Sequence, residues 1–112
     1  MIVKKWKDVE ASEVKEEGAK NVWIRVLIGE KENAPNFIMR HFTIEPGGNT
    51  PYHKHDWEHE VFVLSGKGIV RGENATYSIE AGSFVYVPPN EMHSFENPFD
   101  EPLMILCLIP KK

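Results

Sequence analysis

The sequence predicts an all-β fold, either a barrel or a sandwich, in a single domain. Short runs rich in β-branched and aromatic residues recur at intervals of roughly eight to twelve residues, which is typical of such folds. The 8 glycines and 8 prolines stand almost entirely between these runs, where turns are expected. No segment combines the length and the periodicity of a convincing helix. A chain of 112 residues can bury one hydrophobic core but not two.

The chain divides into a polar N-terminal segment, residues 1–20, and a barrel domain, residues 21–112. In the N-terminal segment, Lys4 to Val9 could form a short edge strand. Ala11 to Gly18 could form one helical turn or a loop that ends at the glycine. Apolar and β-branched residues become frequent after this segment, so the regular strands are expected in the barrel domain.

Eight strands are expected in the barrel domain, each an apolar run that stops near glycine, proline or asparagine. They span residues 22–28, 37–45, 60–64, 69–71, 75–79, 84–87, 93–95 and 103–109. Residues 30–36 are expected to form the turn between the first two strands. The strongest break is Pro46-Gly47-Gly48, which should end the second strand, because proline cannot donate to a strand ladder and glycine favours turns.

Alternation along these strands assigns side chains to the barrel interior, although a slip of one residue would exchange the two faces. The expected interior residues are Phe37, Met39, Val61, Val63, Phe84, Tyr86, Phe95, Ile105 and Cys107. Cys107 is the only cysteine, so no internal disulfide can form. In its apolar strand it is expected to be a small buried hydrophobe instead of a catalytic thiol.

Composition and charge argue against several classes of function. The formal net charge is −4 and there is no basic run, whereas nucleic-acid binding needs a cationic surface. The longest apolar run, residues 103–109, is too short to span a membrane. The N-terminus lacks the apolar core and cleavage site of a signal peptide, so a cytoplasmic location is expected. Charged residues are mostly lysine and glutamate, which favours a thermophilic source.

Histidine is the residue whose distribution carries most of the functional information. Of the 5 histidines, three stand close together at His53, His55 and His59, and a fourth lies downstream at His93. His53 and His55 are two residues apart, so in an extended segment their side chains point to the same side. Inward side chains of neighbouring strands converge in a small barrel, and converging neutral imidazoles are typical transition-metal ligands. The remaining His41 stands alone on a predicted strand and is expected to be structural.

Two spaced motifs around these histidines resemble the two signature motifs of the cupin family. The first motif reads Gly47-x5-His53-x-His55-x3-His59-x6-Gly66. The second motif reads Gly82-x5-Pro88-x-Asn90-x2-His93-x3-Asn97. The strand pattern around the motifs extends the resemblance over most of the chain. The resemblance implies a double-stranded β-helix barrel, also called a jelly roll, that holds one divalent metal ion.

The sequence departs from the common cupin pattern at two positions. Asn90 stands where the second motif usually has glycine, and asparagine tolerates the left-handed backbone conformation of such a turn. His59 stands where most metal-binding cupins carry a glutamate ligand, and the neighbouring Glu60 is the alternative. On a strand, Glu60 would point away from the face that His59 occupies. The predicted ligand set is therefore His53, His55, His59 and His93.

An all-histidine site is similar to that of small manganese-binding cupins from thermophiles, which makes manganese the expected metal. The imidazole ligands alone do not select between manganese, iron, nickel, copper and zinc. Neutral ligands leave the full +2 charge on the ion, which favours anionic ligands at its open positions. Glu58 and Glu60 are expected at the surface or as groups that orient a ligand ring, and Asp56-Trp57 as a turn at the barrel mouth. Arg40 could bind a substrate carboxylate, although an exposed barrel face is the favoured position.

The resemblance implies a metal-dependent enzyme that acts on a small organic molecule, foremost a dioxygenase-type oxidoreductase. A metal-dependent decarboxylase or isomerase is an alternative, although oxalate-decarboxylating cupins usually keep the glutamate ligand. Two further alternatives are a non-catalytic module that binds or senses a metal or small ligand, and a barrel with a closed structural metal site. The sequence assigns no catalytic residue beyond the ligands. Isolated cupin domains commonly pair, so a homodimer is expected, in which the N-terminal strand could add to the partner's sheet edge.

Overall fold

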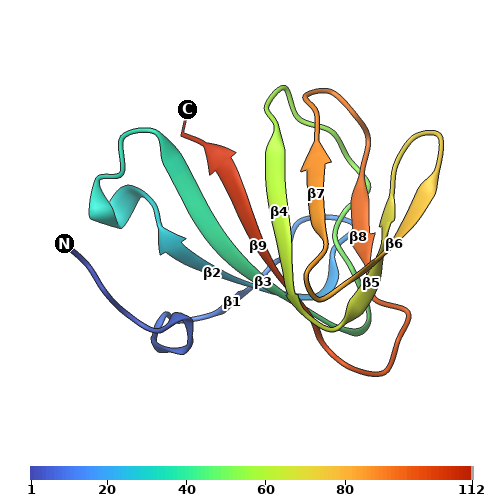
Figure 1. Cartoon of the computed structure of the whole chain (residues 1–112), viewed down its shortest axis with the longest axis horizontal. Coiled ribbons are helices and arrows are strands. Elements are labelled where there is room, and N and C mark those ends of the chain that lie inside the picture. Colours follow the sequence, from blue (N-terminus) through green and yellow to red (C-terminus); the bar gives the residue numbers. More distant parts are fainter. Residues whose placement is uncertain (112) are drawn as a thin grey trace.

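The computed structural model describes residues 1–111, and its regular structure is almost entirely β-strand (Figure 1). The strands are β1 (Ser12–Glu13), β2 (Lys20–Ile28), β3 (Phe37–Asn49), β4 (His59–Ser65), β5 (Lys67–Arg71), β6 (Thr76–Glu80), β7 (Phe84–Val87), β8 (Ser94–Glu96) and β9 (Leu103–Pro110). Two 3-10 turns, η1 (Trp6–Asp8) and η2 (Glu30–Glu32), are the helical elements of the described chain. No helix in that range has the length and apolarity needed to cross a membrane. The predicted all-β class is confirmed.

The strands form one curved sheet that closes almost completely into a barrel. Its main path is β6-β5-β8-β3-β9-β4-β7, while β2 pairs with β3 and the short β1 pairs with β2. Figure 1 shows the long strands β2, β3 and β9 on one side, the smaller strands β5, β6 and β8 on the other, and β4 and β7 between them. The two sides join where Asn49 of β3 pairs with Glu96 of β8. A second link is an isolated bridge between His53 and His93.

The predicted break at Pro46-Gly47-Gly48 is wrong, because β3 continues through it to Asn49. The strand exchanges one partner here: up to Ile44 it pairs with β2 and β9, whereas its last residue, Asn49, pairs with β2 and β8. Gly47 has a φ of 80°, in the left-handed region that favours glycine. A Cβ on Gly48 would lie 2.6 Å from the carbonyl oxygen of Lys20. The glycines therefore permit a bend and a close backbone approach inside a continuous strand.

The N-terminal segment also differs from the prediction. Lys4 to Val9 contains the 3-10 turn η1 and not an edge strand. The ring of Trp6 in this turn stacks on His41 of β3, with the ring centroids 4.3 Å apart. This aromatic contact packs the segment against the sheet and outweighs the weak strand propensity of its residues. Residues 11–18 form a loop that contains only the two-residue β1, in agreement with the second of the two predicted alternatives.

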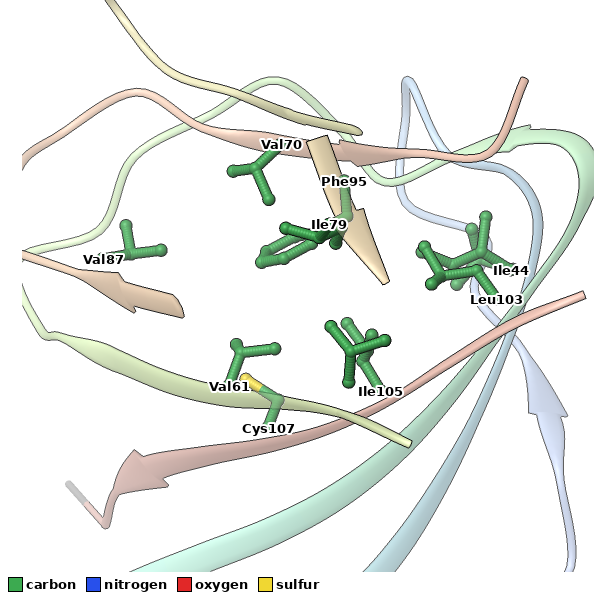
Figure 2. Packing of buried hydrophobic residues seen from close by; sticks show 11 residues of the cluster. Ile44, Val61, Val70, Ile79, Val87, Phe95, Leu103, Ile105 and Cys107 are labelled. Atoms are coloured by element: carbon green, nitrogen blue, oxygen red, sulfur yellow. The ribbon is translucent and has the colours of Figure 1, made fainter. Parts of the chain in front are cut away.

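The side chains of the hydrophobic core point into the barrel interior, as Figure 2 shows. Its members are Val22, Ile44, Val61, Val63, Val70, Ile79, Val87, Phe95, Leu103, Ile105 and Cys107. They come from both sides of the barrel, so burial of their apolar surface holds the two sides together. In Figure 2 the sulfur of Cys107 lies beside Val61, and these two residues are direct neighbours on the paired strands β9 and β4.

The strand parity predicted the interior correctly for some strands and wrongly for others. The residues confirmed in the core are Val61, Val63, Phe95, Ile105 and Cys107. The interior positions predicted for Phe37, Phe84 and Tyr86 are wrong, because these side chains are 68%, 81% and 56% exposed. Met39 is only partly buried. Every residue of β7 is apolar, so its sequence offers no contrast between the two faces, and Val87 takes the inward position.

Candidate metal centre

A cavity of about 230 Å³ lies inside the barrel, and all four predicted ligands line it. The apolar part of its wall comes from Val14, Val22, Ile24, Phe42, Pro51, Trp57, Phe95 and Ile105. Among the described residues that line it, the charged ones are Glu16 and Arg40. A small, mostly apolar cavity with a few convergent polar groups is typical of a site for a small ligand.

Three of the four predicted ligands are brought together at the distances that a shared metal ion needs. One ring nitrogen from each of His53, His55 and His93 lies within 4.8 Å of the other two. The backbone bridge places the distant His93 beside His53: each amide donates to the other's carbonyl oxygen, at 3.1 Å and 2.9 Å. The ring centroids of His53 and His55 are 4.2 Å apart. The cluster therefore depends on a specific pairing of two segments that lie far apart in the sequence.

Hydrogen bonds at the Nδ1 atoms fix the rings of two of these histidines. The Nδ1 of His93 lies 3.0 Å from the carbonyl oxygen of Glu91, which can only accept, so this Nδ1 carries the proton. The Nδ1 of His53 lies 3.0 Å from a carboxylate oxygen of Glu16 and donates in the same way. In both rings the lone pair is then on Nε2, the nitrogen available for a metal. The ring of His55 is held differently, by stacking on Trp57 with a centroid distance of 4.3 Å.

His59 is the first residue of β4, and it is buried whereas Glu60 is exposed. Its ring centroid lies 4.8 Å from that of His93 and 5.3 Å from that of His55. Its Nδ1 lies 3.4 Å from Sγ of Cys107. It is not a member of the three-histidine group that meets within 4.8 Å, so its role as a fourth ligand stays a prediction.

Burial keeps His55, His59 and His93 in the neutral form that a metal requires. It lowers the pKa of His59 to about 3, and repulsion from His93 in its protonated form and from Arg40 contributes to this lowering. Burial is also the main reason why the pKa values of His55 and His93 are lowered. A lowered pKa means that these imidazoles stay deprotonated at neutral pH, so a metal ion would not have to displace protons from them.

The donor set fits a divalent transition metal. The Nε2 of His59 is buried and has no hydrogen-bond partner among residues 1–111. Such a buried polar atom is costly unless another group binds it, and a metal ion beside His93 would do so. Neutral imidazoles with hydrogen-bonded Nδ1 atoms are common ligands of these ions.

Several residues of this centre were not predicted from the sequence. Glu16, and not Glu58 or Glu60, orients a ligand ring, and nothing in the sequence distinguishes it from the neighbouring Glu17. Arg40 lines the cavity instead of occupying an exposed barrel face.

The predicted position of Asp56-Trp57 at a turn is confirmed, and the indole lies in the cavity wall. His41 is buried and stacked on Trp6 outside the cavity wall, consistent with its expected structural role.

The Glu16→Ala variant is expected to bind a divalent metal about tenfold more weakly, because the His53 ring loses the group that fixes its orientation. Competition with a chelator would measure the affinity. The Glu17→Ala variant removes the same charge from the adjacent exposed position and serves as the matched control. Equal affinities for the two variants would show that Glu16 does not position the ring.

A family profile described as "Cupin domain" matches residues 40–109. A 1-methylthio-D-xylulose 5-phosphate methylsulfurylase of Rhodospirillum rubrum is 30% identical over 108 residues, which covers 94% of this chain and 68% of that protein.

Solved structures give a similar result. A polyketide cyclase, RemF, from Streptomyces resistomycificus superposes with a TM-score of 0.94 at 32% identity, covering 100% of this chain and 80% of that one. A predicted oxalate decarboxylase from Thermotoga maritima superposes with a TM-score of 0.86, covering 99% of this chain and 100% of that one. Its 23% identity supports a likeness of fold alone.

Proposed function

Since the chain belongs to the cupin family, we propose that it is a metal-dependent enzyme that acts on a small organic molecule. The predicted double-stranded β-helix barrel is confirmed for this family member. The observation that carries the proposal is the histidine cluster inside the cavity, with one ring nitrogen each from His53, His55 and His93 within 4.8 Å. A structural metal site is usually closed by its protein ligands, whereas this one faces a cavity that a ligand can enter.

One divalent transition-metal ion per chain is the proposed cofactor. Its proposed ligands are His53, His55, His59 and His93. We propose manganese, because the all-histidine set is similar to that of manganese-binding cupins from thermophiles, and the same ligands would accept iron, nickel, copper or zinc. When bound, the ion would supply Lewis-acid or redox chemistry at an oxygen atom of the substrate.

The protein's own residues hold and enclose the substrate. Glu16 and the Glu91 carbonyl fix two of the histidine rings, so the open side of the cluster keeps a constant direction. Apolar side chains such as Phe42 and Ile105 line the cavity and limit the access of water to the bound molecule. In such surroundings the charges around the substrate are screened less than in bulk water.

Two reaction types are compatible with this centre. The first is the oxygen-dependent oxidation, of dioxygenase type, that the sequence resemblance implies. The second is a non-oxidative rearrangement or elimination, such as that of a lyase, isomerase or cyclase. Of the two named relatives, the methylsulfurylase and the cyclase, it is the cyclase, 32% identical to this chain, whose name favours the second type. The chain spans 68% and 80% of those proteins, so their reactions are a guide to chemical type and not to the substrate.

Turnover in the presence and absence of oxygen separates these reaction types. The metal-loaded protein would be incubated with small hydroxyketones and dicarbonyl compounds in D2O, and conversion or deuterium uptake would be followed by NMR. Conversion under nitrogen that is lost in the His93→Ala variant would support the non-oxidative type. Conversion that consumes oxygen in proportion to product would assign the oxidative type. Binding of the compounds without conversion or exchange would favour a non-catalytic module.

We also propose that the chain forms a homodimer. The first residues are apolar and exposed: Met1, Ile2 and Val3 have relative exposures of 118%, 61% and 86%. The strand predicted at Lys4 to Val9 is a 3-10 turn, so we propose that this arm adds to the sheet edge of a second copy in its place. Phe62 and Phe84, paired on the outer face of β4 and β7, are also exposed and offer a second apolar surface. Light scattering of the full chain and of a variant that lacks residues 1–5 would test the role of the arm.

A further inference from the structure

Arg40 places a permanent positive charge in the wall of the metal-site cavity. It lies on β3 opposite Cys107 of β9, and its side chain lines the same cavity as the histidines. Its Nη2 donates a hydrogen bond to Sγ of Cys107 at 3.0 Å. The same sulfur lies 3.4 Å from Nδ1 of His59. A single sulfur atom therefore connects the guanidinium to a proposed ligand ring.

The guanidinium of Arg40 has no acidic partner in the part of the chain that the structure describes. Its Nε is buried and makes no hydrogen bond there. The Cys107 sulfur is only a weak acceptor. The ring of Phe42, whose centroid lies 5.0 Å from Cζ, contributes a cation–π contact but no acceptor. A partly buried cation is costly without an anion, and none of these contacts supplies one. The guanidinium of Arg40 therefore lacks an anionic partner.

The charge balance of the cavity wall favours an anion as that partner. Glu16 is the one acidic residue among the described residues that line the cavity, and its carboxylate already accepts a hydrogen bond from His53. The histidines in the wall are neutral ligands, so they would not offset the charge of an ion that they bind. Arg40 then adds to this positive charge. The planar guanidinium fork matches the two oxygens of a carboxylate or a phosphate better than it matches a neutral group.

We propose that Arg40 binds the carboxylate or phosphate group of a small organic anion, whose other polar end faces the histidine cluster. The inference rests on the proposed function for that second contact, and it names the substrate class of the same site. The cavity volume of about 230 Å³ limits the anion to a small one. Arg40 therefore selects charged molecules over neutral analogues of the same shape.

Binding measurements with three probes test this role of Arg40. Malonate, inorganic phosphate and the neutral malonamide would be titrated by calorimetry into metal-free and metal-loaded protein at pH 8. The natural chain should bind malonate or phosphate at least about tenfold more tightly than malonamide, since hydrogen bonds to charged groups are the stronger ones. Tighter binding of malonate assigns a carboxylate substrate, and tighter binding of phosphate assigns a phosphate ester.

Two variants of Arg40 and one control variant test whether Arg40 is the residue that binds the anion. The Arg40→Met variant should lose about 10- to 100-fold in affinity for the preferred anion, because the charge and the donors are gone. The Arg40→Lys variant should recover part of the loss, because it keeps the charge without the planar fork. The Arg71→Met variant removes an arginine outside the cavity wall and should bind like the natural chain. Thermal melting of each variant would verify that it is folded.

Equal anion affinity in folded Arg40→Met and in the natural chain would overturn the inference, and so would malonamide binding as tightly as both malonate and phosphate. Elemental analysis separates this outcome from a failure of the proposed function. If the metal content is normal and the anion affinity does not change when Arg40 is replaced, only the role of Arg40 is contradicted. A natural chain that takes up no metal would contradict only the metal proposal, because anion binding by the metal-free protein still reports on Arg40.

Discussion

The His59→Ala variant is expected to lose more than about a hundredfold in affinity for a divalent metal. Removal of a ligand should cost more than removal of a group that only orients one, which typically costs about 10- to 100-fold. The buried, unpartnered Nε2 of His59 and its position beside His93 support this role. Chelator competition and elemental analysis after dialysis would measure the loss. The pairing with Cys107 Sγ also disappears in this variant, so its melting temperature must be measured in parallel.

The matched control is Glu60→Ala. Glu60 is adjacent to His59 but exposed, because alternate residues of β4 face opposite sides of the sheet. The Glu60→Ala variant should therefore bind metal like the natural chain. The reverse pattern, with metal lost in Glu60→Ala and retained in His59→Ala, would transfer the ligand role to the carboxylate. Such a site would match the common cupin pattern that this sequence departs from.

The Asn97→Ala variant is expected to lower the free energy of unfolding by about 3 kcal/mol, because a buried polar side chain leaves its partners unsatisfied. Asn97 is 1% exposed and ends the second motif. Its Nδ2 donates to the carbonyl oxygens of Ile44 and Glu101, at 2.8 Å and 2.7 Å. Its Oδ1 accepts from the amide of Phe99 at 3.0 Å. The side chain therefore links β3, at Ile44, to the loop before β9. Urea unfolding would measure the change.

Two further variants show whether these hydrogen bonds are the cause. Asn97→Asp keeps the acceptor for the Phe99 amide but loses both donors, so it should also be strongly destabilised. Asn74→Ala removes the same side chain at an exposed turn and should change stability by less than about 0.5 kcal/mol. If Asn97→Ala lowers the free energy of unfolding by less than about 1 kcal/mol, water must satisfy the backbone groups that hydrogen-bond to the Asn97 amide in the natural chain.

The sequence predicted the inward side of β4 correctly, because the strand begins with the contrasting pair His59-Glu60 before its apolar run. On β4, buried residues alternate with exposed ones along most of the strand, and the predicted positions of His59, Val61 and Val63 inside the barrel are confirmed. On β7 every residue is apolar, and the inward position of Tyr86 was predicted wrongly. The bend inside β3 could not be read from its two glycines, because Gly48 is required by the nearby backbone of Lys20, which is distant in sequence, and Gly47 by its own φ of 80°.

The histidines of the candidate centre were predictable because the motifs fix their spacing. The contacts that Glu16, Arg40 and Cys107 make around them were not, because these three residues lie outside the motifs. Glu16 reaches His53 from the loop between β1 and β2. Arg40 and Cys107 meet because β3 and β9 pair in one particular register. Such contacts depend on tertiary packing, which local patterns do not encode.

A crystal structure of the metal-loaded protein, with anomalous scattering to identify the ion, tests the metal site most directly. The predicted result is one ion per chain, with at least one further position taken by solvent or a small anion. Its predicted protein ligands are His53, His55, His59 and His93. An ion bound without His59 would contradict the predicted ligand set. A tetrahedral ion closed by four protein ligands would contradict the catalytic role and favour a structural one.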